Sequence, residues 1–285
     1  AVRPYRSHGP SFAAKLGAVA AGISSLASFS LASPHTGSMS YRSGTLNAED
    51  RASWGGGELP DVFLGNYSAV PPIPCFALTT EDAHMLQRIQ RRGEVLRMRV
   101  EMEAKMDGVA LSRNLVAEIE GSEKPDEVVV MSGHYDSWDV GCGAQDDLAA
   151  SVVMTKAIAN IQQLGLRPRR TLRLVLFTAE EIGSLGGWAH VRLHPEYEEK
   201  LSAIFDLDSG VFHWLGMGLT GDDQTMQTLR YVSRSLRGIR ADRVQPARYR
   251  ATSNLYMAPR DVPTIGAPLQ VPINAIRPDY YQDVV

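Results

Sequence analysis

The pattern of apolar and polar positions divides this chain into two parts. Up to about residue 105, short periodic stretches are separated by long aperiodic ones, whereas from Asn114 onward apolar runs alternate with helically spaced segments. Strands separated by helices of this length predict a mostly parallel sheet with helices on both faces. We therefore expect a smaller α/β domain over residues 1–105 and a three-layer α/β/α domain over 106–285.

The second part carries the clearer periodicity. Its expected strands are apolar or alternating runs, and they span 115–120, 127–132, 171–177, 202–207 and 262–265. Its expected helices have apolar residues three and four positions apart, and they span 148–164, 184–194 and 223–236. Gly165 follows the first of these helices, in the position where glycine closes a helix C-terminus.

The first part predicts fewer elements. We expect helices over 12–21 and 80–92, and strands over 22–29, 73–78 and 95–103. Thr80 is the expected N-cap of the second helix, because two acidic residues follow it in the first turn. Residues 47–70 show no period and contain three consecutive glycines, which predicts a long loop or an insertion.

Composition and charge narrow the class of function. The 285 residues are 44% hydrophobic and 21% charged, which is typical of a globular protein. A net charge of -3 provides no basic surface, so we expect no nucleic-acid partner. The apolar stretch 12–33 is rich in Ala, Ser and Gly and carries Lys15, so we expect no membrane span there. The chain starts at Ala1 without a charged and then apolar leader, so we expect that any signal peptide has been removed or was never part of this sequence.

The stretch 128–147, VVVMSGHYDSWDVGCGAQDD, concentrates candidate metal ligands. An apolar strand ends in Gly133 and His134. The carboxylates that follow are Asp136, Asp139, Asp146 and Asp147. Neutral imidazole nitrogen and carboxylate oxygen are ligands that zinc accepts. Taken alone, the stretch is compatible either with a metal site or with a polar turn after a core strand.

Two other expected strands also end at acidic residues. One is followed by Glu180 and Glu181, and another by Asp208. In a parallel sheet the carboxyl ends of the strands meet at one edge, so these side chains should converge with His134 and Asp146. Carboxylates gathered that closely repel one another unless cations neutralise them. The sequence therefore predicts a dinuclear metal site.

Glu180 and Glu181 are expected to have different roles. Adjacent residues at a strand end point in opposite directions, so one can bind metal while the other acts as a general base. Two solvated glutamates would explain an isolated pair. They would not explain a pair that lies beside two other acidic strand ends.

At these residues the sequence resembles the co-catalytic zinc peptidases. The matching stretches are SGHYDSWDVGCGAQDD, GLRPRRTLRLVLFTAEEIG and FDLDSGVF, and AAKLGAVAAGISSLASFSLASPHTG resembles their protease-associated domain. The resemblance covers nearly the whole chain and implies a zinc aminopeptidase-like α/β/α fold with two zinc ions. It also implies hydrolysis of small peptides, notably dipeptides with a free amino end, by a homodimer in a secreted or lysosomal setting.

Carried over residue by residue, the resemblance implies a ligand set for each zinc ion. His134 and Asp208 would bind one ion, Glu181 would bind the other, and Asp146 would bridge both. Glu180 would take a proton from the bridging water and pass it to the leaving amine. These roles define a metal-dependent exopeptidase.

The same resemblance has three further consequences. Asp136, two residues after His134, would orient the imidazole. The peptide bond between Asp146 and Asp147 is cis in relatives of this fold. In a secreted protein, the sequon that begins at Asn66 would be a glycosylation site.

The chain departs from the family pattern toward its C-terminus. The second zinc of the family needs a histidine from a late loop, and this chain has no histidine after His213. We expect that ion to bind weakly, because the loss of a ligand lowers metal affinity. Residues 271–285 do not resemble the family's ending, so we expect a C-terminally incomplete or altered catalytic domain. Three interpretations stay open: an exopeptidase on small peptides, an aminopeptidase on longer ones, and a catalytically impaired peptidase-like chain.

Overall fold

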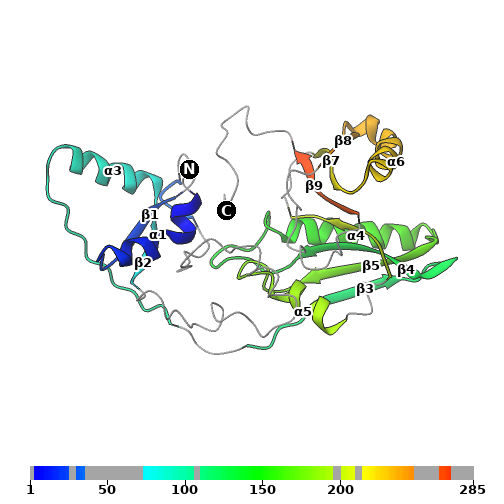
Figure 1. Ribbon diagram of the computed structural model, residues 1–285, viewed down its shortest axis with the longest axis horizontal. Coiled ribbons are helices and arrows are strands. Elements are labelled where there is room, and N and C mark those ends of the chain that lie inside the picture. The colour runs from blue at the N-terminus through cyan, green and yellow to red at the C-terminus, as the bar shows by residue number, and fades with distance from the viewer. Residues whose placement is uncertain are drawn as a thin grey trace. The chain divides into compact units, whose positions relative to one another are not determined.

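The computed structural model describes residues 3–25, 30–35, 73–105, 110–194, 200–208, 214–246 and 263–270. These residues divide into two compact units, one that extends to Ala110 and one that begins at Leu111 (Figure 1). The predicted loop 47–70, the sequon at Asn66, His213 and the tail 271–285 all lie outside the described residues. The assignment of the first unit as a protease-associated domain stays a prediction.

The first unit contains a two-stranded parallel sheet with helices beside it. Its elements are α1 (Arg3–Lys15), β1 (Ala21–Ser24), β2 (Cys75–Leu78) and α3 (Thr80–Arg91). The helix expected over 12–21 is therefore wrong in its bounds, because the chain leaves the helix at Gly17, where φ is 85°. The N-cap of α3 is Thr79 and not Thr80, because the Thr79 side chain accepts a hydrogen bond from the Asp82 N–H.

The strand expected over 95–103 does not form. These residues have no regular secondary structure, and Val95 is 85% exposed. Alternation of apolar and charged side chains is insufficient by itself, because a strand needs the backbone hydrogen bonds of a neighbour. Among the described residues, no strand pairs with this segment.

The second unit is built on a seven-stranded sheet, counted over the described residues (Figure 1). Its strands are β3 (Leu115–Ile119), β4 (Lys124–His134), β5 (Arg170–Phe177), β6 (Leu201–Asp206), β7 (Trp214–Thr220), β8 (Arg243–Pro246) and β9 (Thr264–Gln270). They lie in the order β3-β5-β4-β6-β9-β7-β8. The four adjacent strands β5, β4, β6 and β9 run parallel to one another. β3 is antiparallel to β5, and β7 is antiparallel to β9. The predicted α/β class with a mostly parallel sheet is confirmed.

Two strands of this sheet, β7 and β8, were not predicted. The sequence of β7, WLGMGLT, contains two glycines and lacks a regular alternation of apolar and polar residues. β8 has only four residues, ends in Pro246 and lies at the edge of the sheet. Short edge strands and glycine-containing strands give weak sequence signals, which is why periodicity missed both.

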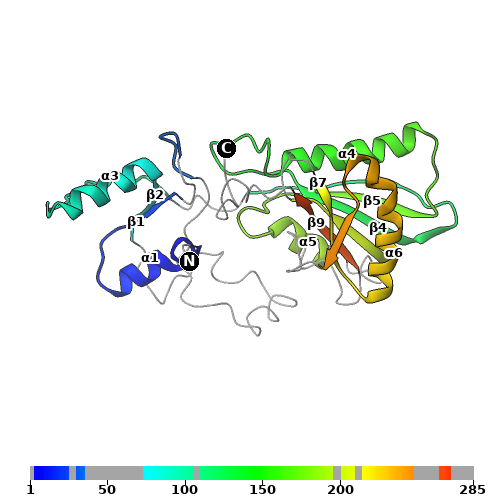
Figure 2. The same cartoon turned by 90° about the horizontal axis from the view of Figure 1, so that it is seen from above.

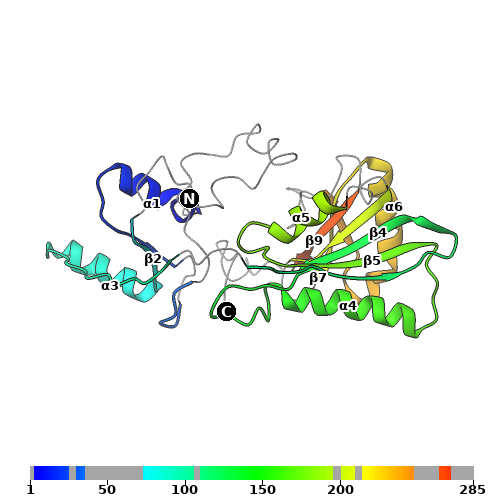
Figure 3. The same ribbon diagram turned by 90° about the horizontal axis from the view of Figure 1, so that it is seen from below.

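Helices cover both faces of the sheet. They are α4 (Leu148–Gln163), α5 (Leu185–Leu193) and α6 (Asp223–Ser233), and a short 3-10 helix (Arg234–Ile239) continues α6. Met154 and Ile158 of α4 pack with Leu174 on one face, whereas Val191 of α5 packs against Val128 and its buried neighbours on the other. Figures 2 and 3 show α4 and α5 on opposite sides of the strands. No helix in the described part of the chain is long and apolar enough to cross a membrane.

The register of the parallel strands brings three strand ends together. β4 lies between β5 and β6, with His134 opposite Phe177 and Ser132 opposite Asp206. The residues that follow Phe177 and Asp206 therefore emerge beside His134. This edge of the sheet is where an open parallel sheet places its ligand sites.

Candidate metal centre

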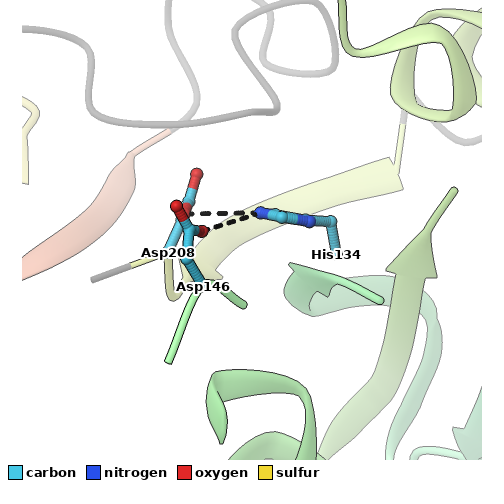
Figure 4. A group of neighbouring side chains, drawn as sticks. All are labelled: His134, Asp146 and Asp208. Atoms are coloured by element: carbon cyan, nitrogen blue, oxygen red, sulfur yellow. Dashed lines mark hydrogen bonds and ion pairs between the residues drawn. The ribbon is translucent and has the colours of Figure 1, made fainter. Parts of the chain in front are cut away.

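His134 is the centre of a group of ligand-capable side chains. It is the last residue of β4, and only 1% of its surface is exposed. Its Nε2 atom lies 3.2 Å from Asp146 Oδ1 and 3.5 Å from Asp208 Oδ1. Figure 4 draws these two contacts as dashed lines. The candidate ligand atoms of the three residues all lie within 4.8 Å of one another. The structure thus brings together three of the four predicted metal ligands.

The electrostatics of this group favour a bound cation. Burial by itself lowers the pKa of His134, but hydrogen bonds with Asp136, Asp146 and Asp208 raise this pKa well above its usual range. The hydrogen bond from His134 in turn lowers the pKa of Asp146. The surrounding carboxylates therefore favour a positive charge at this position, and a metal ion would supply that charge to the neutral imidazole and the carboxylates together. His134 and Asp208 lie at strand ends, and Asp146 lies in the loop that leads into α4. One imidazole nitrogen and two carboxylates are a donor set that fits zinc.

Asp136 joins His134 to the end of the neighbouring strand. The Nδ1 atom of His134 lies 3.0 Å from the backbone oxygen of Asp136 and 3.4 Å from its Oδ1. The Asp136 carboxylate also accepts hydrogen bonds from the backbone N–H groups of Glu180 (3.0 Å) and Glu181 (3.2 Å). Burial raises the pKa of Asp136, but its hydrogen bond with His134 and these N–H groups give a net lowering. The contact between Asp136 and His134 was expected from the sequence, whereas the two hydrogen bonds from the Glu180 turn to Asp136 were not.

Glu180 and Glu181 lie in a turn and not on a strand. β5 ends at Phe177, and Ala179 has a φ of 54°, so the alternation that was expected to separate the two side chains does not apply. Asn114 fixes both ends of the turn. Its side chain donates a hydrogen bond to the Gly186 carbonyl and accepts one from the Thr178 N–H. The two glutamates are therefore positioned through their backbone.

Glu180 has the electrostatics of a proton acceptor near neutral pH. Burial raises its pKa to about 7, and the Asp208 carboxylate contributes in the same direction. The Ser184 hydroxyl donates a hydrogen bond of 3.1 Å to Glu180 Oε1. A carboxyl group with a pKa close to the working pH is suited to general base catalysis. Glu181 is not a member of the His134 group, and its predicted role as a ligand of another ion stays a prediction.

Two further carboxyl groups are buried: Asp147, which the sequence offered only as one of several carboxylates in the stretch 128–147, and Asp206, for which nothing was predicted. Asp147 is fully buried. Burial is the main cause that raises its pKa to about 9, and the negative charge of Asp208 adds to it. Asp206 is also buried; burial raises its pKa well above the usual range, and its Oδ1 accepts from the Ser132 hydroxyl. The sequence did contain a signal for Asp206. An acidic residue between the apolar Phe205 and Leu207, in a run typical of a buried strand, is unusual enough to indicate a special role. The Asp146–Asp147 bond is cis, as is the Asp139–Val140 bond.

Comparison with known proteins gives a consistent family match. The model of Peptidase family M28 matches residues 114–257. Carboxypeptidase Q of Mus musculus is 41% identical over 240 residues, which are 84% of this chain and 46% of that protein. Carboxypeptidase Q of Homo sapiens is 40% identical over 228 residues, with 80% and 43% of the two chains covered. The chain therefore spans about half the length of the curated relatives it matches.

A solved structure extends this similarity to the fold. The crystal structure of a peptidase M28 precursor from Shewanella amazonensis superposes with a TM-score of 0.76 at 26% identity. The match covers 94% of this chain and 55% of that one. The fold of most of this chain has thus been seen before in a solved structure.

Proposed function

The chain belongs to Peptidase family M28, and on that basis we propose that it is a zinc-dependent exopeptidase that hydrolyses small peptides, in particular dipeptides. The observation that carries this proposal is the convergence of His134, Asp146 and Asp208 at one edge of the sheet. The similarity to proteins named carboxypeptidase Q supports an exopeptidase. The specificity for dipeptides rests on the sequence resemblance.

The metal ligands divide between two ions in this proposal. His134 and Asp208 would hold one zinc ion and Glu181 the other, with Asp146 available to both. Zinc, when bound, supplies a Lewis acid and lowers the pKa of a water molecule. Asp136 keeps the imidazole of His134 in place from the Nδ1 side, at 3.0 Å from its backbone oxygen.

Glu180 moves the proton. Its carboxylate, with a pKa of about 7, accepts a proton from the attacking water and then donates it to the amine that leaves. Since the Ser184 hydroxyl donates to Oε1, we assign the proton to Oε2 of Glu180. The hydrogen bond from the Glu180 N–H to Asp136 fixes the backbone of Glu180 next to the residue that contacts His134.

A dipeptide hydrolysis assay with added zinc tests the proposal. The Glu180→Gln variant should lose about 10²- to 10⁴-fold of the rate, because it cannot accept the proton. Its zinc content should equal that of the parent, since Glu180 is not a ligand. If parent and variant are equally inactive, the exopeptidase proposal fails for this chain. Faster cleavage of longer peptides than of dipeptides would instead support an aminopeptidase.

A second candidate function is a catalytically impaired peptidase-like protein. The observation that favours it is the absence from the sequence of any histidine after His213, which leaves Glu181 without the imidazole partner that the resemblance implies. Metal analysis after dialysis against a weak chelator tests this point. One tightly held zinc per chain, lost in His134→Ala, would support a weakened second site. Two tightly held ions per chain would rule it out.

Location and assembly are further parts of the proposal. The resemblance supports a secreted or lysosomal protein that forms a homodimer, with a small peptide as its substrate. Asn66 would then carry a glycan. Glycosidase treatment of the protein secreted from cells tests the glycan, and sedimentation equilibrium tests the dimer. A monomer at micromolar concentration would contradict the latter.

A further inference from the structure

The N-terminus of α4 has an aspartate that does not cap its helix. Asp147 is the N-cap residue, but among the described residues its side chain accepts no hydrogen bond from the first turn. The N-cap of α6 shows the ordinary arrangement, because Asp222 accepts a hydrogen bond of 2.7 Å from the Thr225 N–H. Asp147 instead directs Oδ2 to the backbone N–H of His134, at 3.1 Å. Because Asp147 lacks, among the described residues, the capping hydrogen bond that is usual for this position, its contact with His134 indicates a role outside its own helix.

The backbone carbonyl of His134 is held from the same helix. The Ser151 hydroxyl donates a hydrogen bond of 2.6 Å to the His134 oxygen. Ser151 is 2% exposed and Asp147 is fully buried, so water does not compete for either contact. The Ser151 N–H also donates a hydrogen bond of 3.1 Å to the backbone carbonyl oxygen of Asp147. This bond connects the two residues across the first turn of α4. One helical turn thus holds both polar backbone groups of His134.

Gly133 provides the room that this arrangement needs. A Cβ atom at this position would lie 2.8 Å from Asp147 Oδ2 and 3.1 Å from the Leu207 oxygen. Any side chain here would therefore displace the Asp147 carboxyl from the His134 N–H. The glycine before the histidine is explained by the close approach of the loop and not by its own backbone conformation.

We propose that Asp147 and Ser151 are positioning residues that fix the backbone of His134, and through it the imidazole, in the geometry that zinc binding requires. The inference rests on the proposed zinc site. Metal ligands must be held to within about 0.5 Å, and a buried backbone held at both its N–H and its carbonyl meets that demand. Because Asp147 follows Asp146 directly, the same turn of α4 also places the second ligand.

Zinc affinity and amide exchange test this inference on the full chain. Ser151→Ala should bind zinc about 10- to 100-fold more weakly, as measured by competition with a chromophoric chelator. Asp147→Ala should do the same and should also speed the hydrogen exchange of the His134 amide in metal-free protein. Ser151→Thr keeps the hydroxyl and should restore the affinity to within about threefold of the parent.

Thr155→Val is the matched control. Thr155 lies one turn further along α4, and its hydroxyl donates to the Ser151 oxygen at 2.7 Å, so it touches neither backbone group of His134. Its zinc affinity should stay within about twofold of the parent. Thermal unfolding identifies variants that do not fold. If Asp147→Ala fails to fold, the comparison of Ser151→Ala with Ser151→Thr decides the matter.

The outcomes separate the two proposals. A folded Ser151→Ala that binds zinc as tightly as the parent would overturn the positioning role, and so would a parent chain that binds no zinc. A parent that binds zinc but cleaves no dipeptide would count against the exopeptidase only. The affinity series would then still report on Asp147 and Ser151.

Discussion

Two carboxylates, one in each unit, each accept hydrogen bonds from two consecutive backbone N–H groups, but they have different consequences for the protein. In the first unit, Glu81 accepts hydrogen bonds from the N–H groups of Ser30 (2.8 Å) and Leu31 (3.2 Å). In the second unit, Asp136 accepts from two consecutive N–H groups at 3.0 and 3.2 Å. Glu81 is exposed and holds a loop to α3, whereas Asp136 is partly buried and also contacts the imidazole of His134.

The difference shows how a structural contact becomes part of a functional site. A carboxylate that accepts two backbone N–H groups fixes the path of the chain, and this holds for Glu81 and Asp136 alike. Only Asp136 lies between two strand ends that both carry candidate catalytic groups. It therefore fixes His134 relative to the turn that carries Glu180. We expect substitutions at these positions to differ in the same sense.

Asp136→Ala should have the largest effect. It leaves the N–H groups of Glu180 and Glu181 without their acceptor and removes an oxygen from beside Nδ1 of His134. We expect zinc affinity to fall about 10- to 100-fold and the free energy of unfolding to fall by about 3 kcal/mol. Chelator competition and urea unfolding measure the two quantities. Asp136→Asn keeps one acceptor oxygen and should lie between Asp136→Ala and the parent; unchanged zinc affinity in both would remove Asp136 from the metal centre.

Asn114→Ala should have an intermediate effect, on stability alone. Its side chain makes two hydrogen bonds to the backbone of the Glu180 turn but does not touch His134. The free energy of unfolding should fall by about 1–2 kcal/mol, with little change in zinc affinity. Ser112→Ala is the control, because Ser112 makes an exposed hydroxyl contact with Thr178 in the same turn and should change stability by less than about 0.5 kcal/mol. A large loss of zinc affinity in Asn114→Ala would mean that anchoring the turn matters more than the contact with the imidazole.

Glu81→Gln should have the smallest effect, confined to the first unit and dependent on pH. Hydrogen bonds from the backbone and side chain of Ser30 lower the pKa of Glu81 to about 2 from an ordinary 4.5. A lowered carboxyl pKa stabilises the folded state fully above pH 4.5, and this contribution is lost as the pH falls toward about 2. The amides of Ser30 and Leu31 should therefore lose protection from hydrogen exchange over that range.

In Glu81→Gln this pH dependence should disappear, because the amide does not titrate. Glu94→Gln, which removes an exposed ion pair with Arg92, should retain the parent behaviour. Zinc affinity should not change in either variant. Protection of Ser30 and Leu31 that stays constant from pH 5 to 2 in the parent would contradict the assigned role of Glu81.

Much of the second unit follows from the order of residues along the chain. Apolar runs that end in His134 or are followed by Asp208 are local features, so periodicity locates both the strands and the polar groups beyond them. The rule that parallel strands present their carboxyl ends at one edge then predicts that these groups meet. The structure places His134 and Asp208 together by this logic, and the loop before α4 adds Asp146 to them.

Only the tertiary structure decided which atoms meet at that edge. The contact of Asp136 with the Glu180 turn, and the diversion of Asp147 from its own helix to His134, depend on the register between strands and on the position of α4. The same limit explains the segment 95–103, whose alternation predicts a strand that the described structure does not pair. Periodicity reports which face of an element is apolar. Hydrogen bonds between distant segments depend on which partner is within reach, and that is settled only when the chain has folded.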